Sequence, residues 1–112
     1  MMRRAHSYSP SAVQTARVLG LEIARARRAQ RMSQVELAER AGISENTLRS
    51  VERGAPTVAV GIVFEVARLV GLDLLGVQPS DLSDIEARSR ERLALLPARV
   101  RPRPGEEIDD DF

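Results

Sequence analysis

The sequence contains no cysteine, no lysine and no tryptophan, and its single histidine, His6, lies near the N-terminus. Without cysteine the chain has no disulfide, no thiolate metal site and no cysteine nucleophile. It also has no phosphate-binding glycine loop. An enzyme is therefore the class that we least expect, and we predict no catalytic residues, no bound metal and no cofactor.

Aromatic residues and long apolar runs are also scarce. No uninterrupted apolar segment approaches the ~20 residues of a membrane-spanning helix, and no apolar signal core follows the first arginines, so we expect a cytoplasmic protein without membrane contact. Aromatic residues make up only 3% of the chain. The core must then consist of Ala, Leu, Val and Ile, which favours helices over a β-sandwich. A chain of 112 residues has room for one folded core.

The 17 basic residues are all arginine, and they are distributed unevenly although the net charge is only +1. Residues 1–31 hold seven arginines and one acidic residue, whereas residues 105–112 hold five acidic residues and no arginine. A cationic first part and an anionic end predict two different interaction surfaces. Charges that only keep the protein soluble would give the same pattern.

Cap residues and helical apolar periodicity predict an all-α fold. After a flexible arm at residues 1–8, Ser9 and Pro10 mark the start of a first helix that runs to about Gln30. Gly20 lies in its apolar stripe and would permit close packing of another helix. Two shorter helices follow, one between Ser33 and Gly42 and one between Ser44 and Gly54.

The second half of the chain is expected to hold two more helices. Thr57 is the predicted cap of a fourth helix that ends near Val70. The apolar stripe of that helix is expected at Val60, Val63, Phe64, Ala67 and Val70. Residues 72–77 are too short to assign and fit either a helical turn or an edge strand. Ser80 is the predicted cap of a fifth helix that reaches Leu96, and the acidic end beyond it is expected to be disordered when free.

Residues 33–54 carry the most informative pattern, because two short helices meet there at a turn that contains glycine. This spacing is typical of a helix-turn-helix. The residues that face inward are Leu37, Ala38, Ala41, Ile43, Leu48 and Val51. The helix between Ser44 and Gly54 carries outward-facing residues that are short and polar or basic. It lacks the Glu-to-Lys pairs, four residues apart, of an ordinary solvated helix. Such side chains can reach bases and phosphates in a DNA major groove, although a hairpin in an unrelated bundle is the alternative.

The segment S-Q-V-E-L-A-E-R-A-G-I-S-E-N-T-L-R-S-V-E-R-G resembles the helix-turn-helix of Xre or phage-repressor proteins, and the resemblance covers roughly residues 17–72. It implies a five-helix repressor-like domain at residues 9–78 that binds double-stranded operator DNA on the nucleoid. The residues to which it assigns DNA contact are Gln34, Ser44, Glu45, Asn46, Thr47, Arg49, Ser50 and Arg53. Arg49 and Arg53 suit phosphates, and Gln34 suits a phosphate or a base. Glu45 departs from the family pattern, so it either accepts from cytosine or caps the helix.

The same resemblance places Arg27 of the first helix against Glu52 at the end of the third helix, as a partly buried ion pair. Arg27 falls on the apolar stripe of its helix, which favours the pair over two independent surface charges. The other arginines of this region, Arg25, Arg28 and Arg31, are equally suited to phosphate contact and to solvent. A recognition helix of this size reads few base pairs, so we expect a homodimer, through the fourth helix, residues 72–77 or the fifth helix.

Beyond the DNA-binding domain the chain continues with a helix at 79–97 and with an Arg/Pro linker and acidic tail at 98–112. The run E-R-G-A-P-T-V-A-V-G-I-V-F-E-V-A-R-L-V-G, the segment L-L-P-A-R-V-R and the motif D-D-D-F together resemble HipB-type antitoxins. The resemblance implies a HipA-like serine/threonine kinase toxin as partner. The candidate partner-binding residues of the tail are Ile108, Asp109, Asp110, Asp111 and Phe112.

Three functions therefore compete at the level of the sequence. The first is a dimeric repressor that also serves as the antitoxin of a HipA-like kinase and represses its own operon. The second is a self-sufficient Xre-type regulator without a toxin. The third is a protein-interaction adaptor that has lost DNA binding, and in that case the tail would only add solubility or compete with DNA for the cationic surface.

Overall fold

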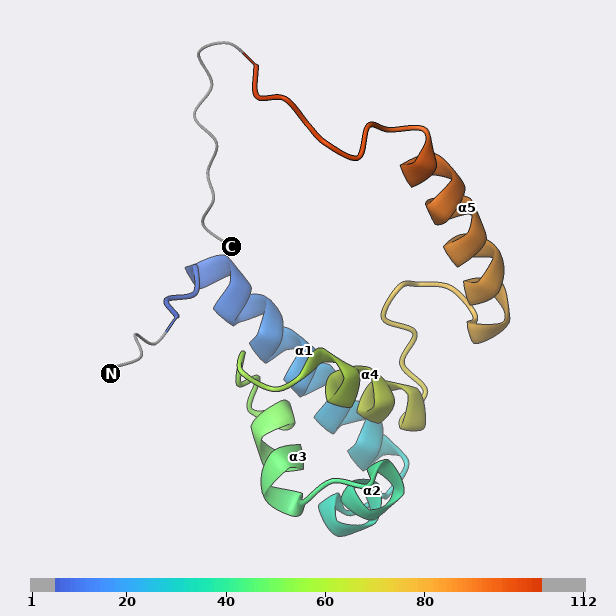
Figure 1. Cartoon of the computed structure of the whole chain (residues 1–112). Coiled ribbons are helices and arrows are strands. Elements are labelled where there is room, and N and C mark those ends of the chain that lie inside the picture. Colours follow the sequence, from blue (N-terminus) through green and yellow to red (C-terminus); the bar gives the residue numbers. More distant parts are fainter. Residues whose placement is uncertain (1–5, 104–112) are drawn as a thin grey trace. The chain divides into compact units, whose positions relative to one another are not determined.

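The computed structural model describes residues 6–103, and every regular element in that range is a helix. The helices are α1 (Pro10–Ala29), α2 (Gln34–Ala41), α3 (Glu45–Glu52), α4 (Val60–Leu69) and α5 (Leu82–Ala94), with a 3-10 helix, η1 (Pro79–Asp81), before α5 (Figure 1). The predicted all-α class is confirmed. The chain divides into two compact units, one that ends at Gly76 and one that begins at Val77. Residues 1–5 of the predicted arm and residues 104–112 of the predicted tail lie outside the described residues.

The first unit has the aliphatic core that the composition predicts. Four side chains in it are 0% exposed, and each comes from a different helix: Ile23, Leu37, Leu48 and Val66. Five further buried residues complete the core: Met32, Ala38, Val51, Ala67 and Val70. Because each fully buried aliphatic side chain contributes about 1.5–3 kcal/mol, this cluster is the main force that holds α1 to α4 together.

Each of these four helices ends in the same backbone motif. A residue in the left-handed conformation follows the helix, and the next residue donates its N–H back to a carbonyl in the last turn. The left-handed residues are Arg31 (φ 55°), Gly42 (φ 70°), Gly54 (φ 75°) and Gly71 (φ 80°). The three predicted glycine stops are confirmed. Arg31 was not foreseen in this role, because a side chain in this conformation carries a steric cost of about 1–2 kcal/mol.

Three of the predicted N-caps are confirmed, since the Oγ atoms of Ser9, Ser33 and Ser44 each accept a hydrogen bond from a backbone N–H in the first helical turn. The other two predicted caps are wrong. Residues 55–58 form a turn in which Val58 packs against the core, so α4 begins only at Val60 and Thr57 caps nothing. Ser80 lies inside η1, because Pro79 starts a 3-10 turn there.

The predicted apolar stripe of α4 is only partly right. Val66, Ala67 and Val70 are buried, but Val60 and Phe64 are 64% and 51% exposed. The two charged residues of α4, Glu65 and Arg68, lie three positions apart and mark its exposed face, opposite Val66 and Val70, and the predicted stripe did not take them into account. Residues 72–77 form a turn, with Gly76 donating its N–H to the Asp73 carbonyl at 3.0 Å, and not a strand.

Helix α1 and the C-terminal end of α3 approach each other at Gly20. A Cβ atom placed on Gly20 would lie 2.5 Å from the Glu52 carbonyl oxygen and 2.6 Å from that of Val51. Both distances are far below van der Waals contact, and both atoms belong to backbone that cannot move alone. The absence of a side chain at Gly20 is therefore a condition for the contact between α1 and α3, as the sequence predicts.

Replacement of Gly20 with alanine is expected to destabilise the protein. Overpacking costs about 1–3 kcal/mol, and this exceeds the gain of about 0.5–1 kcal/mol that alanine normally brings to a helix interior. The matched control is Gly61→Ala in α4, where a Cβ would meet nothing within 4 Å. Urea unfolding should show a lower midpoint for Gly20→Ala and a raised one for Gly61→Ala. Equal shifts in both variants would contradict the close approach.

Candidate nucleic-acid interface

The rotation of α3 is fixed by its two apolar residues, Leu48 (0% exposed) and Val51 (4% exposed), which lie in the core. The opposite face of the helix carries a stripe of polar residues spaced three, four and seven positions apart, as neighbours on one helix face must be. This polar stripe consists of Asn46, Arg49, Ser50 and Arg53. Ser50 is half-buried and the other three are exposed.

The side chains of the polar stripe have weak partners or none within residues 6–103. Asn46 makes no side-chain hydrogen bond there, and Arg53 donates to the Ser50 hydroxyl at 3.4 Å. Arg49 lies 3.5 Å from Glu45, which corrects the expectation that this helix lacks ion pairs four residues apart. Both side chains are about half exposed. Exposed pairs of this spacing contribute only about 0.3–0.5 kcal/mol, so a phosphate can replace the carboxylate as the partner of Arg49.

The beginning of α3 is organised by Ser44. Its Oγ accepts the Thr47 N–H at 3.0 Å and shares a hydrogen bond of 2.9 Å with the Thr47 hydroxyl. Two of the residues to which the sequence assigns DNA contact therefore also hold the first turn of the helix. Ser44, and not Glu45, is the N-cap, so the alternative of a capping role for Glu45 is wrong.

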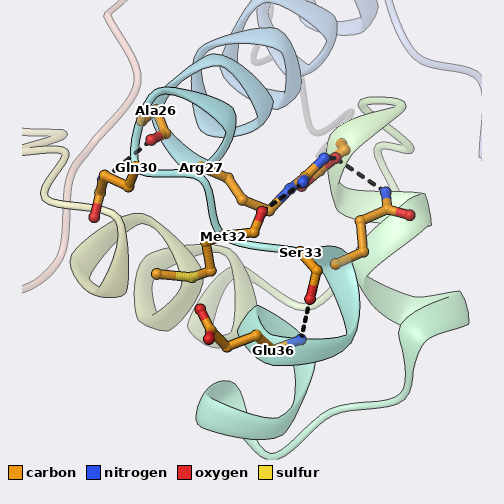
Figure 2. A network of polar contacts seen from close by, with 8 residues as sticks. Ala26, Arg27, Gln30, Met32, Ser33 and Glu36 are labelled. Carbon is orange, nitrogen blue, oxygen red and sulfur yellow. Dashed lines mark hydrogen bonds and ion pairs between the residues drawn. The ribbon is translucent and has the colours of Figure 1, made fainter.

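Arg27 and Glu52 lie together beneath this surface, as the resemblance implies. Arg27 Nε donates to Glu52 Oε2 at 2.7 Å, and Arg27 Nη2 donates to Oε1 at 2.9 Å. The third guanidinium nitrogen, Nη1, donates to the Met32 carbonyl at 2.9 Å (Figure 2). The two side chains are 7% and 8% exposed. The hydrogen bond to Glu52 raises the pKa of Arg27 although burial acts against it, so the buried guanidinium remains charged.

Gln34 extends this cluster to α2. Its Nε2 donates to Glu52 Oε1 at 3.1 Å, so the carboxylate accepts hydrogen bonds from α1 and from α2 at once. The sequence did not reveal this contact, because a polar residue just after a cap gives no indication of its partner. Gln34 is half-buried and one of its amide hydrogens is engaged, so any contact with DNA uses the rest of the amide.

The other arginines near Arg27, at positions 25, 28 and 31, differ in their surroundings. Arg25 forms an exposed pair with Glu22 at 2.7 Å; this hydrogen bond raises the pKa of Arg25 and lowers that of Glu22. Arg28 and Arg31 are exposed. The predicted tail residues 108–112 lie outside the described residues.

The geometry of α2 and α3 defines a helix-turn-helix protein: two eight-residue helices share one core, and the second of them presents a polar stripe outward. A comparison with known families agrees. Residues 23–77, slightly under half of the chain, match the helix-turn-helix family model, and the match supports the Xre family and a DNA-binding regulator. No curated protein and no solved structure matches the chain. None of the helices within residues 6–103 is long and apolar enough to cross a membrane.

Replacement of Glu52 with alanine is expected to lower the melting temperature strongly. It would leave the Arg27 guanidinium buried without a counter-charge, a change that typically costs about 3–5 kcal/mol. The control is Glu65→Ala, which breaks the exposed Glu65–Arg68 pair and should change the melting temperature little.

The double variant Arg27→Met with Glu52→Leu separates loss of the pair from loss of space filling. Because it leaves no buried charge unpaired, it should be more stable than Glu52→Ala alone. Thermal unfolding followed by circular dichroism measures all three variants. An unchanged melting temperature for Glu52→Ala would show that the pair does not hold α1 to α3.

Proposed function

We propose that the protein is a sequence-specific transcriptional repressor that binds operator DNA as a homodimer and carries out no catalysis. The observation that supports this function best is the polar stripe of α3, which is exposed and weakly partnered while the opposite face of the same helix is locked in the core. Asn46 has the bidentate amide that reads adenine, and Arg49 and Arg53 have the charge that binds phosphate. The cytoplasm, on the nucleoid, is the place where such a repressor acts.

A dimer follows from the size of this reading surface. One eight-residue recognition helix contacts only a few base pairs, and two copies related by a twofold axis double the site that is read. Half-sites about one helical turn apart are the expected operator geometry.

We further propose that the repressor is the antitoxin of a HipA-like serine/threonine kinase and represses the operon that encodes both proteins. The support is the resemblance of three sequence segments to HipB-type antitoxins, together with the five acidic residues between positions 106 and 111 and with Phe112. An acidic segment can be steered to a basic groove by its carboxylates and anchored there by an aromatic ring. A self-sufficient regulator without a toxin is equally consistent with the helix-turn-helix, and the tail experiment below separates the two.

Substitutions on the polar stripe should affect DNA binding in two distinct ways. Asn46→Ala removes a base contact and should relax the preference at one operator position, a loss of about 1–3 kcal/mol of discrimination. Arg49→Ala and Arg53→Ala remove phosphate contacts, so each should weaken binding to all sequences and reduce the slope of log affinity against log salt by about 0.9.

The probe for these measurements is a duplex selected from a random library by the wild-type protein. Arg68→Ala in α4 is the matched control, because it removes an exposed arginine away from the polar stripe and should leave the salt slope unchanged. Wild-type binding with no salt dependence and no sequence preference would favour the adaptor without DNA binding.

The tail should be required for capture of the kinase and not for DNA binding. A tagged full-length chain should recover a protein with kinase motifs from its native host, and a chain truncated after Pro104 should not. Phe112→Ala should accelerate dissociation of the complex, whereas replacement of Asp109, Asp110 and Asp111 with asparagine should slow association and reduce its salt dependence. Recovery of DNA alone by both chains would identify a self-sufficient regulator.

A further inference from the structure

Three arginines alternate with other residues just beyond α5, at positions 99, 101 and 103. Residues 99–103, R-V-R-P-R, are called the arginine segment below, and they lie at the red end of the coloured chain in Figure 1. All five residues are exposed, and none of them lies in a helix. The segment therefore presents positive charge to solvent, and neither the polar stripe of α3 nor the proposed contact of the tail makes use of it.

The charges of the arginine segment lack the acidic neighbours that the helices provide. Five exposed arginines of the helices pair with a carboxylate three or four positions away, as Arg90 does with Glu86 at 2.8 Å. No acidic residue stands between Glu91 and Glu106 in the sequence. Within residues 6–103, Arg99 and Arg101 make no side-chain hydrogen bond or ion pair. A segment of this kind attracts an anionic partner.

The backbone of the arginine segment suits a linear anion with a regular repeat. Arg101 and Arg103 each precede a proline, which restricts them to extended backbone. An extended chain advances about 3.1–3.6 Å per residue, so alternate arginines are about 6–7 Å apart along it. Two base-pair steps of DNA, at about 3.4 Å each, cover the same distance. Successive arginines of the segment can therefore keep in step with the charge of a DNA duplex.

Among the surfaces of DNA, the minor groove fits a single extended chain best. It is only about 6 Å wide, whereas the major groove is about 12 Å wide and takes a helix such as α3. The narrow minor groove of A·T-rich DNA has an enhanced negative potential that attracts arginine. An acidic protein is a weaker candidate, because Val100 is the one aliphatic side chain of the segment and an aromatic anchor is absent from it.

We propose that the arginine segment is a second DNA-binding element, which lies in the minor groove of A·T-rich DNA beside the half-site that α3 reads. The proposal rests on the proposed function, because binding of α3 to an operator holds the rest of the same chain at a high local concentration near that DNA. The segment adds a preference for A·T base pairs at positions that α3 does not contact.

Removal of the charge tests the contact with DNA. Replacement of the three arginines of the segment with glutamine (R99Q, R101Q, R103Q) in the full chain should weaken binding to an operator with A·T flanks about tenfold or more. The slope of log affinity against log salt should fall by about 0.9 for each arginine that neutralises a phosphate.

The matched control replaces Arg88, Arg90 and Arg92 of α5 with glutamine, which removes the same charge from the same unit. Glutamine is as good a helix former as arginine, so α5 is retained. This control should change the affinity and the salt slope much less. Equal losses in the two variants would reveal only a general effect of net charge and would overturn the proposal.

The flanking base pairs identify the groove. The probe is the duplex selected by the wild-type protein, with the base pairs that flank each half-site made A·T, G·C or inosine·C. Inosine lacks the amino group that guanine places in the minor groove and keeps the major-groove edge of guanine. The wild-type protein should bind A·T and inosine·C flanks about equally and G·C flanks about tenfold more weakly. The glutamine variant of the segment should bind all three about equally.

Three other results would overturn the proposal. Equal wild-type affinity for all three flanks would exclude the minor groove, and equal weakening by G·C and inosine·C flanks would indicate readout in the major groove. Unchanged DNA binding by the glutamine variant, together with loss of a captured protein, would make an acidic protein the partner of the segment. In each of these cases the wild-type protein still binds the selected duplex through α3. Failure of the wild-type protein to select any duplex would instead reject the repressor function itself.

Discussion

The structure of the first unit depends on how the C-terminal end of α3 is held against α1. Glu52 makes two contacts there, with its side chain on Arg27 and with its backbone carbonyl beside Gly20. Two attachment points seven residues apart on α1 fix both the position and the direction of α3. Because Leu48 and Val51 fix its rotation, the polar stripe on the opposite face is presented in one orientation. A surface that reads base edges requires this rigidity.

Arginine is the residue that this arrangement requires. Arg27 uses Nε, Nη1 and Nη2 of its planar guanidinium for three hydrogen bonds, two to the Glu52 carboxylate and one to the Met32 carbonyl. The compact ammonium group of a lysine does not have this geometry. The Glu52 carboxylate likewise accepts three hydrogen bonds, since Gln34 of α2 supplies a third donor beside the two of Arg27. One carboxylate thus connects the first three helices, and no buried polar side-chain atom within residues 6–103 lacks a hydrogen-bond partner.

The sequence predicted the parts of the fold that follow from local chemistry. Serine caps, glycine stops and the inward residues of α2 and α3 were all readable, because each depends on a few neighbouring residues. The rotation of α4 was predicted wrongly because its apolar residues outnumber its charged ones, although Glu65 and Arg68 mark the face opposite Val66. The contact of Gln34 with Glu52 was hidden for another reason: it joins residues 18 positions apart and leaves no periodic trace. Local signals therefore located the candidate DNA-binding surface, but not the polar contacts that support it.

The two units of the chain differ in how their apolar residues are covered. The first unit is complete, with a closed core and a polar reading surface, and nothing in its burial calls for α5. The second unit has the opposite character, with apolar residues exposed along a helix that has no core. A helix of that kind is unfavourable in a monomer, because its apolar side chains remain in water and the ordering of its backbone loses conformational entropy without burial to offset it. Such a helix depends on association for most of its stability, whereas α1 to α4 are held by the core that they share.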